Sequence, residues 1–193
     1  MRKLIVCNII SLDGFYSGPG NDVRVMPFDA GFSDYNAERL RAADTLVLGR
    51  TSYEGFKSYW PAIAEDESQP AVEREISRLN TAIEKVVISN SLKPDEIEGW
   101  GPTRILRRAD AHAGVAALKR GPGRDILIFG SHVLWNDLLA AGLVDELHLM
   151  IGAGVIAAGV RAFESQPPGS LRLVDTRTFA GSSLLMARYA VER

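Results

Sequence analysis

Short apolar runs that alternate with helical segments constrain the fold of this chain more than any other feature. The first run, Leu4–Ile10, is apolar on both faces, as a strand buried within a parallel sheet requires. Similar strand-like runs follow at Thr45–Leu48, Lys85–Ser89, Thr103–Leu106, Asp125–Phe129 and Glu146–Ile151. Helical spacing and capping signals predict helices at Ser33–Ala43, from Thr51 to near Pro61, and at Ala71–Leu79, Ala111–Lys119 and Val133–Ala140. The alternation predicts an α/β fold, with a mainly parallel sheet flanked by helices.

The end of the chain has a different pattern. Two strand-like segments, Leu171–Thr178 and Leu184–Val191, are joined by a short connection with no helix between them. Strands joined in this way pair antiparallel, so we expect a C-terminal antiparallel hairpin added to the parallel sheet. No internal repeat or linker divides the 193 residues, which predicts a single domain over residues 1–193.

Composition argues against several classes of partner and site. The formal net charge is −2 and no cluster of Lys and Arg occurs, so nucleic acid is not an expected partner. No segment approaches the roughly 20 apolar residues that span a membrane, and a cytoplasmic location is expected. The single cysteine, Cys7, excludes an internal disulfide. The three histidines lack the spacing of metal ligands, so no metal is expected.

The strongest functional pattern lies where the run Thr45–Leu48 meets the next helix. The run ends at Gly49, and Arg50 precedes a capping-box spacing of Thr51 and Glu54, which predicts Thr51 as the N-cap. A helix N-terminus offers free N–H groups and the positive end of its dipole to an anion. Arg50 adds a planar set of donors that suits a phosphate. The alternative is an ordinary strand-to-helix turn with a solvated arginine.

Two further strand ends carry suitable chemistry. Gly130 and Ser131 follow one strand and precede a helix, and Ser89 and Asn90 end another strand. Ligands of open α/β sheets bind beyond the carboxyl ends of the strands. We therefore expect Gly49, Ser89 and Gly130 to lie at the same edge of the sheet.

These segments together resemble the dihydrofolate reductase-like superfamily, in particular the reductase (RibD C-terminal) domain of riboflavin-biosynthesis enzymes and its stand-alone relatives. The resemblance covers nearly the whole chain. It is carried, in order, by Ser11-Leu12-Asp13-Gly14, Leu48–Glu54, Ile88-Ser89-Asn90, Phe129-Gly130-Ser131 and Gly142–Leu147. It implies a dihydrofolate reductase-like fold, NADPH as cofactor, a small-molecule substrate and a homodimer.

The resemblance also implies roles for individual residues. Arg50 would face the 2′-phosphate of NADPH, with Ser89 and Asn90 nearby. The pyrophosphate would lie near Thr51 and Ser52 and near the start of the later helix. The implied cofactor-binding set is Gly49, Arg50, Thr51, Ser52, Ser89, Asn90, Phe129, Gly130, Ser131 and His132.

Three residues are candidates for chemistry at the substrate. Asp13 lies just beyond the first strand and is the candidate for delivering a proton, and its alternative is a structural Asx-turn residue. Asp34 is a candidate substrate anchor, the alternative being a solvated helix face. Tyr16 is a candidate to line the mouth of the same site or simply to pack.

Two departures from the family concern the substrate. The riboflavin-pathway reductases carry a glutamate where this chain has Phe129, and usually a lysine where it has Phe15. The favoured hypothesis is an NADPH-dependent reductase that transfers hydride to a small heterocyclic, pteridine- or pyrimidine-like substrate. The alternatives are a 5-amino-6-(5-phosphoribosylamino)uracil reductase and a non-catalytic nucleotide-binding or sensor protein on the same fold.

Overall fold

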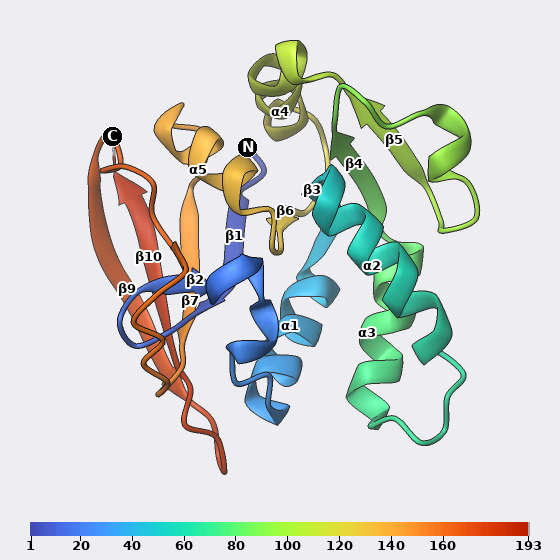
Figure 1. The fold of residues 1–193 in the computed structure, drawn as a ribbon. Coiled ribbons are helices and arrows are strands. Elements are labelled where there is room, and N and C mark those ends of the chain that lie inside the picture. The colour runs from blue at the N-terminus through green and yellow to red at the C-terminus, as the bar shows by residue number, and fades with distance from the viewer. Residues whose placement is uncertain (193) are drawn as a thin grey trace.

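The computed structural model describes residues 1–192, and its centre is an eight-stranded sheet (Figure 1). The strands of this sheet are β1 (Leu4–Ile10), β3 (Ala43–Gly49), β4 (Glu84–Ile88), β5 (Thr103–Leu106), β6 (Asp125–Ile128), β7 (Glu146–Ile151), β9 (Ser170–Thr178) and β10 (Leu185–Glu192). Their order is β5-β4-β3-β6-β1-β7-β10-β9. The first six strands in this order run parallel, and β10 pairs antiparallel with both β7 and β9. The predicted mainly parallel sheet and C-terminal antiparallel hairpin are confirmed.

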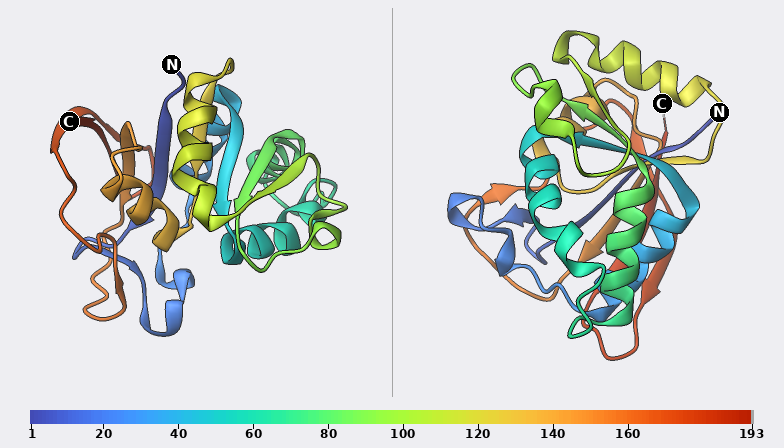
Figure 2. Two further views of the ribbon diagram at one scale, coloured as in Figure 1. Left: turned by 90° about the horizontal axis from the view of Figure 1, so that it is seen from above. Right: turned by 90° about the vertical axis from the view of Figure 1, so that its right-hand side faces the viewer.

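Five α-helices cover the two faces of the sheet (Figure 2). They are α1 (Ala30–Ala42), α2 (Arg50–Ile63), α3 (Ala71–Ala82), α4 (Ala111–Arg120) and α5 (His132–Ala140). Four short 3-10 turns are η1 (Pro19–Asn21), η2 (Val23–Val25), η3 (Pro94–Ile97) and η4 (Arg108–Asp110). A separate pair of short strands, β2 (Phe15–Ser17) and β8 (Val160–Arg161), ties the loop after β1 to the loop after β7. Within residues 1–192, no helix combines the length and apolarity needed to cross a bilayer.

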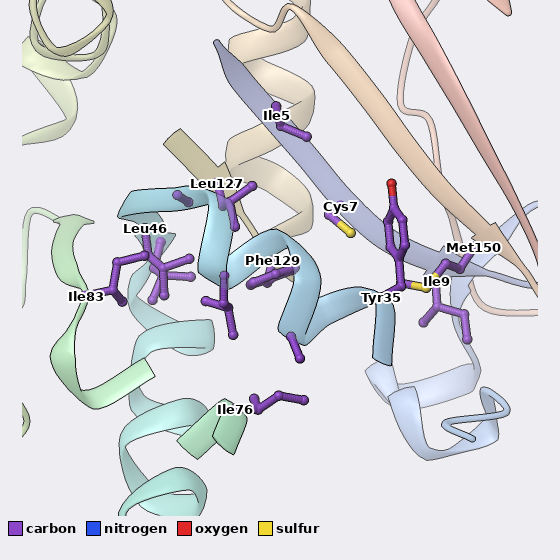
Figure 3. Packing of buried hydrophobic residues seen from close by; sticks show 14 of the residues in the cluster. Ile5, Cys7, Ile9, Tyr35, Leu46, Ile76, Ile83, Leu127, Phe129 and Met150 are labelled. Carbon is purple, nitrogen blue, oxygen red and sulfur yellow. The ribbon is translucent and has the colours of Figure 1, made fainter. Parts of the chain in front are cut away.

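Successive residues of β1 contribute to two different cores, because side chains alternate across a strand. Ile5, Cys7 and Ile9 pack with residues from α1, α2 and α3 on one face (Figure 3). Leu4, Val6 and Ile10 pack with residues from α4 and α5 on the other face. All seven residues of β1 are therefore buried, which explains why the run is apolar on both faces apart from Asn8.

The starts of two helices differ from the sequence-based expectation. Helix α1 begins at Ala30, and its N-cap is Asp29, whose side chain accepts a hydrogen bond from the N–H of Phe32 at 3.2 Å. The predicted start at Ser33 was therefore wrong, and Ser33 instead lies buried within the helix and donates to Glu73.

The predicted cap of α2 was also wrong. The N-cap is Gly49 and no side chain caps the helix, so Thr51 lies in the first turn and is exposed. Gly49 already has the extended conformation of a cap residue, with φ −78° and ψ 160°, where β3 ends. The helix therefore begins at Arg50, directly after β3. With Thr51 as the cap, Arg50 would instead lie outside the helix. The helix also passes Pro61 and ends at Ile63.

Candidate functional site

The carboxyl ends of four neighbouring strands meet at one edge of the sheet. Strands β4, β3, β6 and β1 are adjacent and parallel, so the residues that follow them lie along the same edge. These residues include Ser89 after β4, Gly130 after β6 and Ser11 after β1, with Gly49 as the last residue of β3. The predicted convergence of Gly49, Ser89 and Gly130 at this edge is confirmed, and we call it the carboxyl edge.

Hydrogen bonds join the turn that begins α2 to the turn that begins α5. The N–H of Gly49 donates to the Ser131 hydroxyl at 3.0 Å, and the N–H of Ser131 donates to the Ser52 hydroxyl at 2.8 Å. Ser131 takes a left-handed conformation with φ +55°, which is uncommon for a residue other than glycine. The two helix N-termini are therefore held side by side, and both favour an anion at this position.

Gly130 lies where a side chain has little room. Its φ is +58°, and a Cβ there would lie 3.0 Å from the Ser52 hydroxyl and 3.4 Å from the Tyr16 hydroxyl. Asn8 holds the same residue from β1: its Oδ1 accepts the Gly130 N–H at 2.6 Å, and its Nδ2 donates to the Gly130 carbonyl at 3.2 Å. Sequence reasoning missed Asn8, although it is the one polar residue in an otherwise apolar run and is buried.

Arg50 lies over the end of β4 and is held by three side chains. Its guanidinium donates to Glu54 at 2.6 Å, to the Ser91 hydroxyl at 2.8 Å and to Glu96 at 3.3 Å. The side chains of these two ion pairs are between 36% and 47% exposed. Exposed ion pairs contribute only about 0–1 kcal/mol, so they leave Arg50 able to exchange a carboxylate for a phosphate.

The loop after β4 is organised by its own polar groups. The buried Ser89 hydroxyl accepts the N–H groups of Ser91 at 3.2 Å and Leu92 at 3.0 Å. The exposed Asn90 accepts the backbone N–H of Arg108 through its side chain at 2.9 Å. Ser89 therefore shapes the loop, whereas Asn90 ties it to the segment after β5.

A cavity of about 320 Å³ opens between the end of β4 and the starts of α4 and α5. Its lining residues are Ile88, Arg108, Ala111, His112, Val133, Leu134 and Asp137. His112 and Asp137 hydrogen-bond across it at 2.8 Å. The Arg108 guanidinium makes no hydrogen bond or ion pair with any described residue, 1–192, and is available to a ligand. Sequence reasoning missed Arg108; its signal is the Arg107-Arg108 pair directly after a strand of this edge.

The Asp13 carboxylate accepts hydrogen bonds from uncharged groups of the same chain. Its carboxylate accepts the Ser11 hydroxyl at 2.6 Å and the N–H groups of Ile156 at 3.1 Å and Ala157 at 2.7 Å. The Ser11 hydrogen bond is the main reason that the pKa of Asp13 is lowered to about 2. A carboxylate with this pKa carries no proton at neutral pH. The contacts favour the structural alternative, in which Asp13 anchors the loop after β7.

The remaining candidates lie in different surroundings. Tyr16 stacks beside His132 with ring centroids 4.9 Å apart, and burial raises the pKa of Tyr16 to about 12. The Nε2 of His132 donates to the Arg161 carbonyl at 2.8 Å, which joins the start of α5 to β8. Phe129 packs in the core (Figure 3), so only its backbone faces this edge. The side chain of Asp34 is exposed on α1 and forms no hydrogen bond or ion pair within the described part of the chain.

Comparisons with known proteins identify the family that this chain resembles. A family model described as the RibD C-terminal domain matches residues 2–185. The chain is 31% identical over 182 residues to the uncharacterized protein YyaP of Bacillus subtilis (strain 168), which covers 93% of this chain and 90% of that protein.

Two solved structures share the fold at low identity. The diaminohydroxyphosphoribosylaminopyrimidine deaminase/5-amino-6-(5-phosphoribosylamino)uracil reductase of Thermotoga maritima matches with a TM-score of 0.70 at 9% identity, over 98% of this chain and 56% of that one. Dihydrofolate reductase from Enterococcus faecalis, complexed with NADP(H), matches with a TM-score of 0.60 at 16% identity, over 99% and 97%. The fold is dihydrofolate reductase-like, and because the family model spans nearly the whole sequence, the chain belongs to the RibD C-terminal domain family.

Proposed function

We propose that this protein is an NADPH-dependent reductase that acts on a small heterocyclic, pteridine- or pyrimidine-like substrate. The observation that carries the proposal is the junction of the α2 and α5 starts through Gly49, Ser52 and Ser131. It places two helix N-termini at one position, where they favour a pyrophosphate. The likeness to a dihydrofolate reductase complexed with NADP(H) supports the same cofactor.

The residues at the carboxyl edge fit a dinucleotide phosphate in two respects. Gly130 has no side chain to cover its backbone, which permits close approach of a ligand. Arg50 and Arg108 approach the β4 end from α2 and η4, and either guanidinium suits a 2′-phosphate. The cavity beside Arg108 has the size and partly apolar lining to take a nucleoside.

NADPH, when bound, supplies the hydride, so the chain has to bind, orient and exclude water. Asn8 fixes the Gly130 backbone, and Asp13 holds the loop after β7 against the loop after β1. Tyr16 closes the same region with its hydroxyl beside Gly130. These contacts position backbone and cofactor, and none of them requires a protonated carboxylate.

The surroundings of Phe15 and Phe129 favour a substrate other than the sugar-phosphate pyrimidine of riboflavin synthesis. Both side chains are buried, each 7% exposed. They stand where the family's riboflavin-pathway members carry a lysine and a glutamate, so two charged contacts to that substrate are absent from these positions. The proposed substrate is accordingly a smaller or less charged heterocycle.

A homodimer is proposed to form along β9, the edge strand of the sheet. Leu173 and Val174 on this strand are 52% and 38% exposed. An uncovered edge strand with apolar side chains is prone to pair with another chain. Light scattering should give a dimer mass, and Leu173→Lys should shift it toward the monomer mass.

The proposal is tested by fluorescence titration of the purified protein with NADPH and with NADH. At least one of the variants Arg50→Ala and Arg108→Ala should weaken NADPH binding by about tenfold or more. The affected arginine is the one that makes a charge-assisted contact to the 2′-phosphate. NADH binding should change by less than about twofold, since it lacks that phosphate. Arg78→Ala, an exposed arginine on α3, is the charge-matched control.

The outcomes separate a reductase from the non-catalytic sensor alternative. NADPH binding with consumption of NADPH in the presence of a pteridine or pyrimidine supports the reductase. Selective NADPH binding with no turnover of any such compound favours the sensor alternative. The absence of binding of both nucleotides would contradict the proposal.

A further inference from the structure

A second cavity, of about 440 Å³, lies at the opposite edge of the sheet from the candidate site. Its lining includes the first residues of β6 and β7, the start of β1, and side chains from α1 and β10. In Figure 2 (left), β1 runs down the page from the N-terminus, so this amino edge lies at the top of the view. Six Lys and Arg side chains line the cavity, against two carboxylates, Asp125 and Glu146.

The two lining carboxylates neutralise only part of this charge. Both oxygens of Glu146 are taken, one by Lys3 at 2.6 Å and the other by His148 at 2.8 Å. Burial alone would raise the pKa of Glu146, but these two hydrogen bonds leave it below its ordinary value. The side chain of Asp125 forms no hydrogen bond or ion pair with any residue from 1 to 192. The cavity therefore keeps an excess of positive charge.

The guanidinium groups of Arg39 and Arg188 contribute to this positive charge, and each has a hydrogen-bond donor without a partner among the described residues. The Nε of each is buried and has no hydrogen-bond acceptor within residues 1–192. Arg39 lies over the Tyr35 ring, 5.4 Å from its centroid, and has one ion pair, with Glu38. The side chain of Arg188, on β10, forms no hydrogen bond or ion pair with any described residue. A buried donor without an acceptor costs about 1–3 kcal/mol, and more when it is charged.

We propose that this cavity binds the oxyanion group, phosphate or carboxylate, of a small metabolite, with Arg39 and Arg188 as its principal donors. A guanidinium presents paired N–H groups that match the oxygens of either group. Both arginines line this one cavity, so their guanidinium groups are available to the same ligand. The volume leaves room for more of the molecule than the oxyanion alone. The site lies at the amino edge and does not depend on the cofactor.

The site can be tested by isothermal titration calorimetry of the wild-type protein. Inorganic phosphate and citrate are titrated separately at the same ionic strength. Saturable binding of at least one is expected, and the tighter of the two identifies the preferred oxyanion. Arg39→Gln and Arg188→Gln should each weaken it by about tenfold or more. Asp125→Asn should strengthen it, because the substitution removes a negative charge from the lining.

Two controls locate the bound anion. Arg108→Gln removes a cation from the carboxyl edge, and Arg78→Gln removes one from the surface of α3. Arg78→Gln should bind within about twofold of the wild type, whereas Arg108→Gln reports any anion bound at the carboxyl edge. Absence of saturable binding overturns the proposal. So does a loss in Arg108→Gln with unchanged binding in Arg39→Gln and Arg188→Gln, because the anion would then occupy the carboxyl edge.

Discussion

The side-chain amide of Asn8 hydrogen-bonds both the N–H and the carbonyl of Gly130, which lies 122 residues later in the chain. Gly130 precedes α5, whose N-terminus faces the candidate cofactor site. The amide is buried and connects the central strand β1 to the turn after β6. Asn8 thereby sets the position of a backbone segment that we propose to contact the cofactor.

Asn8→Ala should weaken NADPH binding by about tenfold and lower the free energy of unfolding by about 1–3 kcal/mol, because it leaves two buried backbone groups without partners. Urea unfolding and NADPH titration measure the two effects. Asn36→Ala is the matched control: Asn36 is also buried and accepts a long-range hydrogen bond, from Cys7, but it lies on α1. Equal loss of NADPH binding in both variants would contradict the role of Asn8.

Gly130→Ala should separate backbone strain from loss of the binding space. An alanine at φ +58° costs about 1–2 kcal/mol, and its Cβ would also enter the space beside Ser52 and Tyr16. Gly181 has a φ of +74° with no atom near its Cβ position, so Gly181→Ala carries strain alone. Thermal unfolding should show a loss in both variants, with the larger loss in Gly130→Ala because of its close contact with Ser52, and only Gly130→Ala should lose NADPH binding. Unchanged NADPH binding in Gly130→Ala would count against the phosphate site.

Lys85 should make the unfolding free energy depend on pH. Its fully buried Nζ donates to the carbonyls of Asn80 at 2.6 Å and Ile83 at 2.8 Å and lies 4.5 Å from the Trp100 ring centroid. Burial lowers the pKa of Lys85 from its ordinary value of 10.5 to about 8. Between these values the unfolded chain binds more protons than the folded one, so stability rises with pH.

The wild type should therefore gain stability relative to Lys85→Met between about pH 8 and pH 10.5, by at most about 1.4 kcal/mol per pH unit. At neutral pH the variant should be less stable by about 1–3 kcal/mol, because carbonyls at the end of α3 lose their donor. Urea unfolding over this pH range measures both effects. Parallel stability curves for the two proteins would show that Lys85 does not titrate there.

Asp13→Asn should loosen the loop after β7 and reduce stability at neutral pH. The pKa of Asp13 is lowered from 3.8 to about 2, so its contribution is present above pH 3.8 and is lost as the pH falls toward 2. The stability difference between wild type and variant should therefore shrink over that range. Hydrogen exchange at the amides of Ile156 and Ala157 should be faster in the variant at neutral pH. Unchanged exchange would show that Asp13 does not anchor this loop.

Local patterns in the sequence determined most of the secondary structure. The bounds of β1, β5 and β7 agree with the runs Leu4–Ile10, Thr103–Leu106 and Glu146–Ile151. Burial of both faces of a parallel sheet demands apolar residues throughout, and this demand is readable without knowing the neighbours. The alternation of runs and helices likewise implies that several strand ends share one edge, which is why Gly49, Ser89 and Gly130 could be grouped.

Tertiary structure alone decided the helix starts and the partners within the site. Asp29 rather than Ser33 caps α1, and Gly49 rather than Thr51 precedes α2, because the cap depends on how the preceding loop or strand delivers the chain. The hydrogen bonds from Asn8 to Gly130 and from Gly49 to Ser131 join segments distant in sequence, and the grouping of Arg39 with Arg188 needs two elements packed together. The hydrophobic periodicity of the sequence predicts helices and strands, because it depends only on residue types and their local spacing. These contacts could not be predicted in this way, because they join residues that come close only after the sheet has assembled.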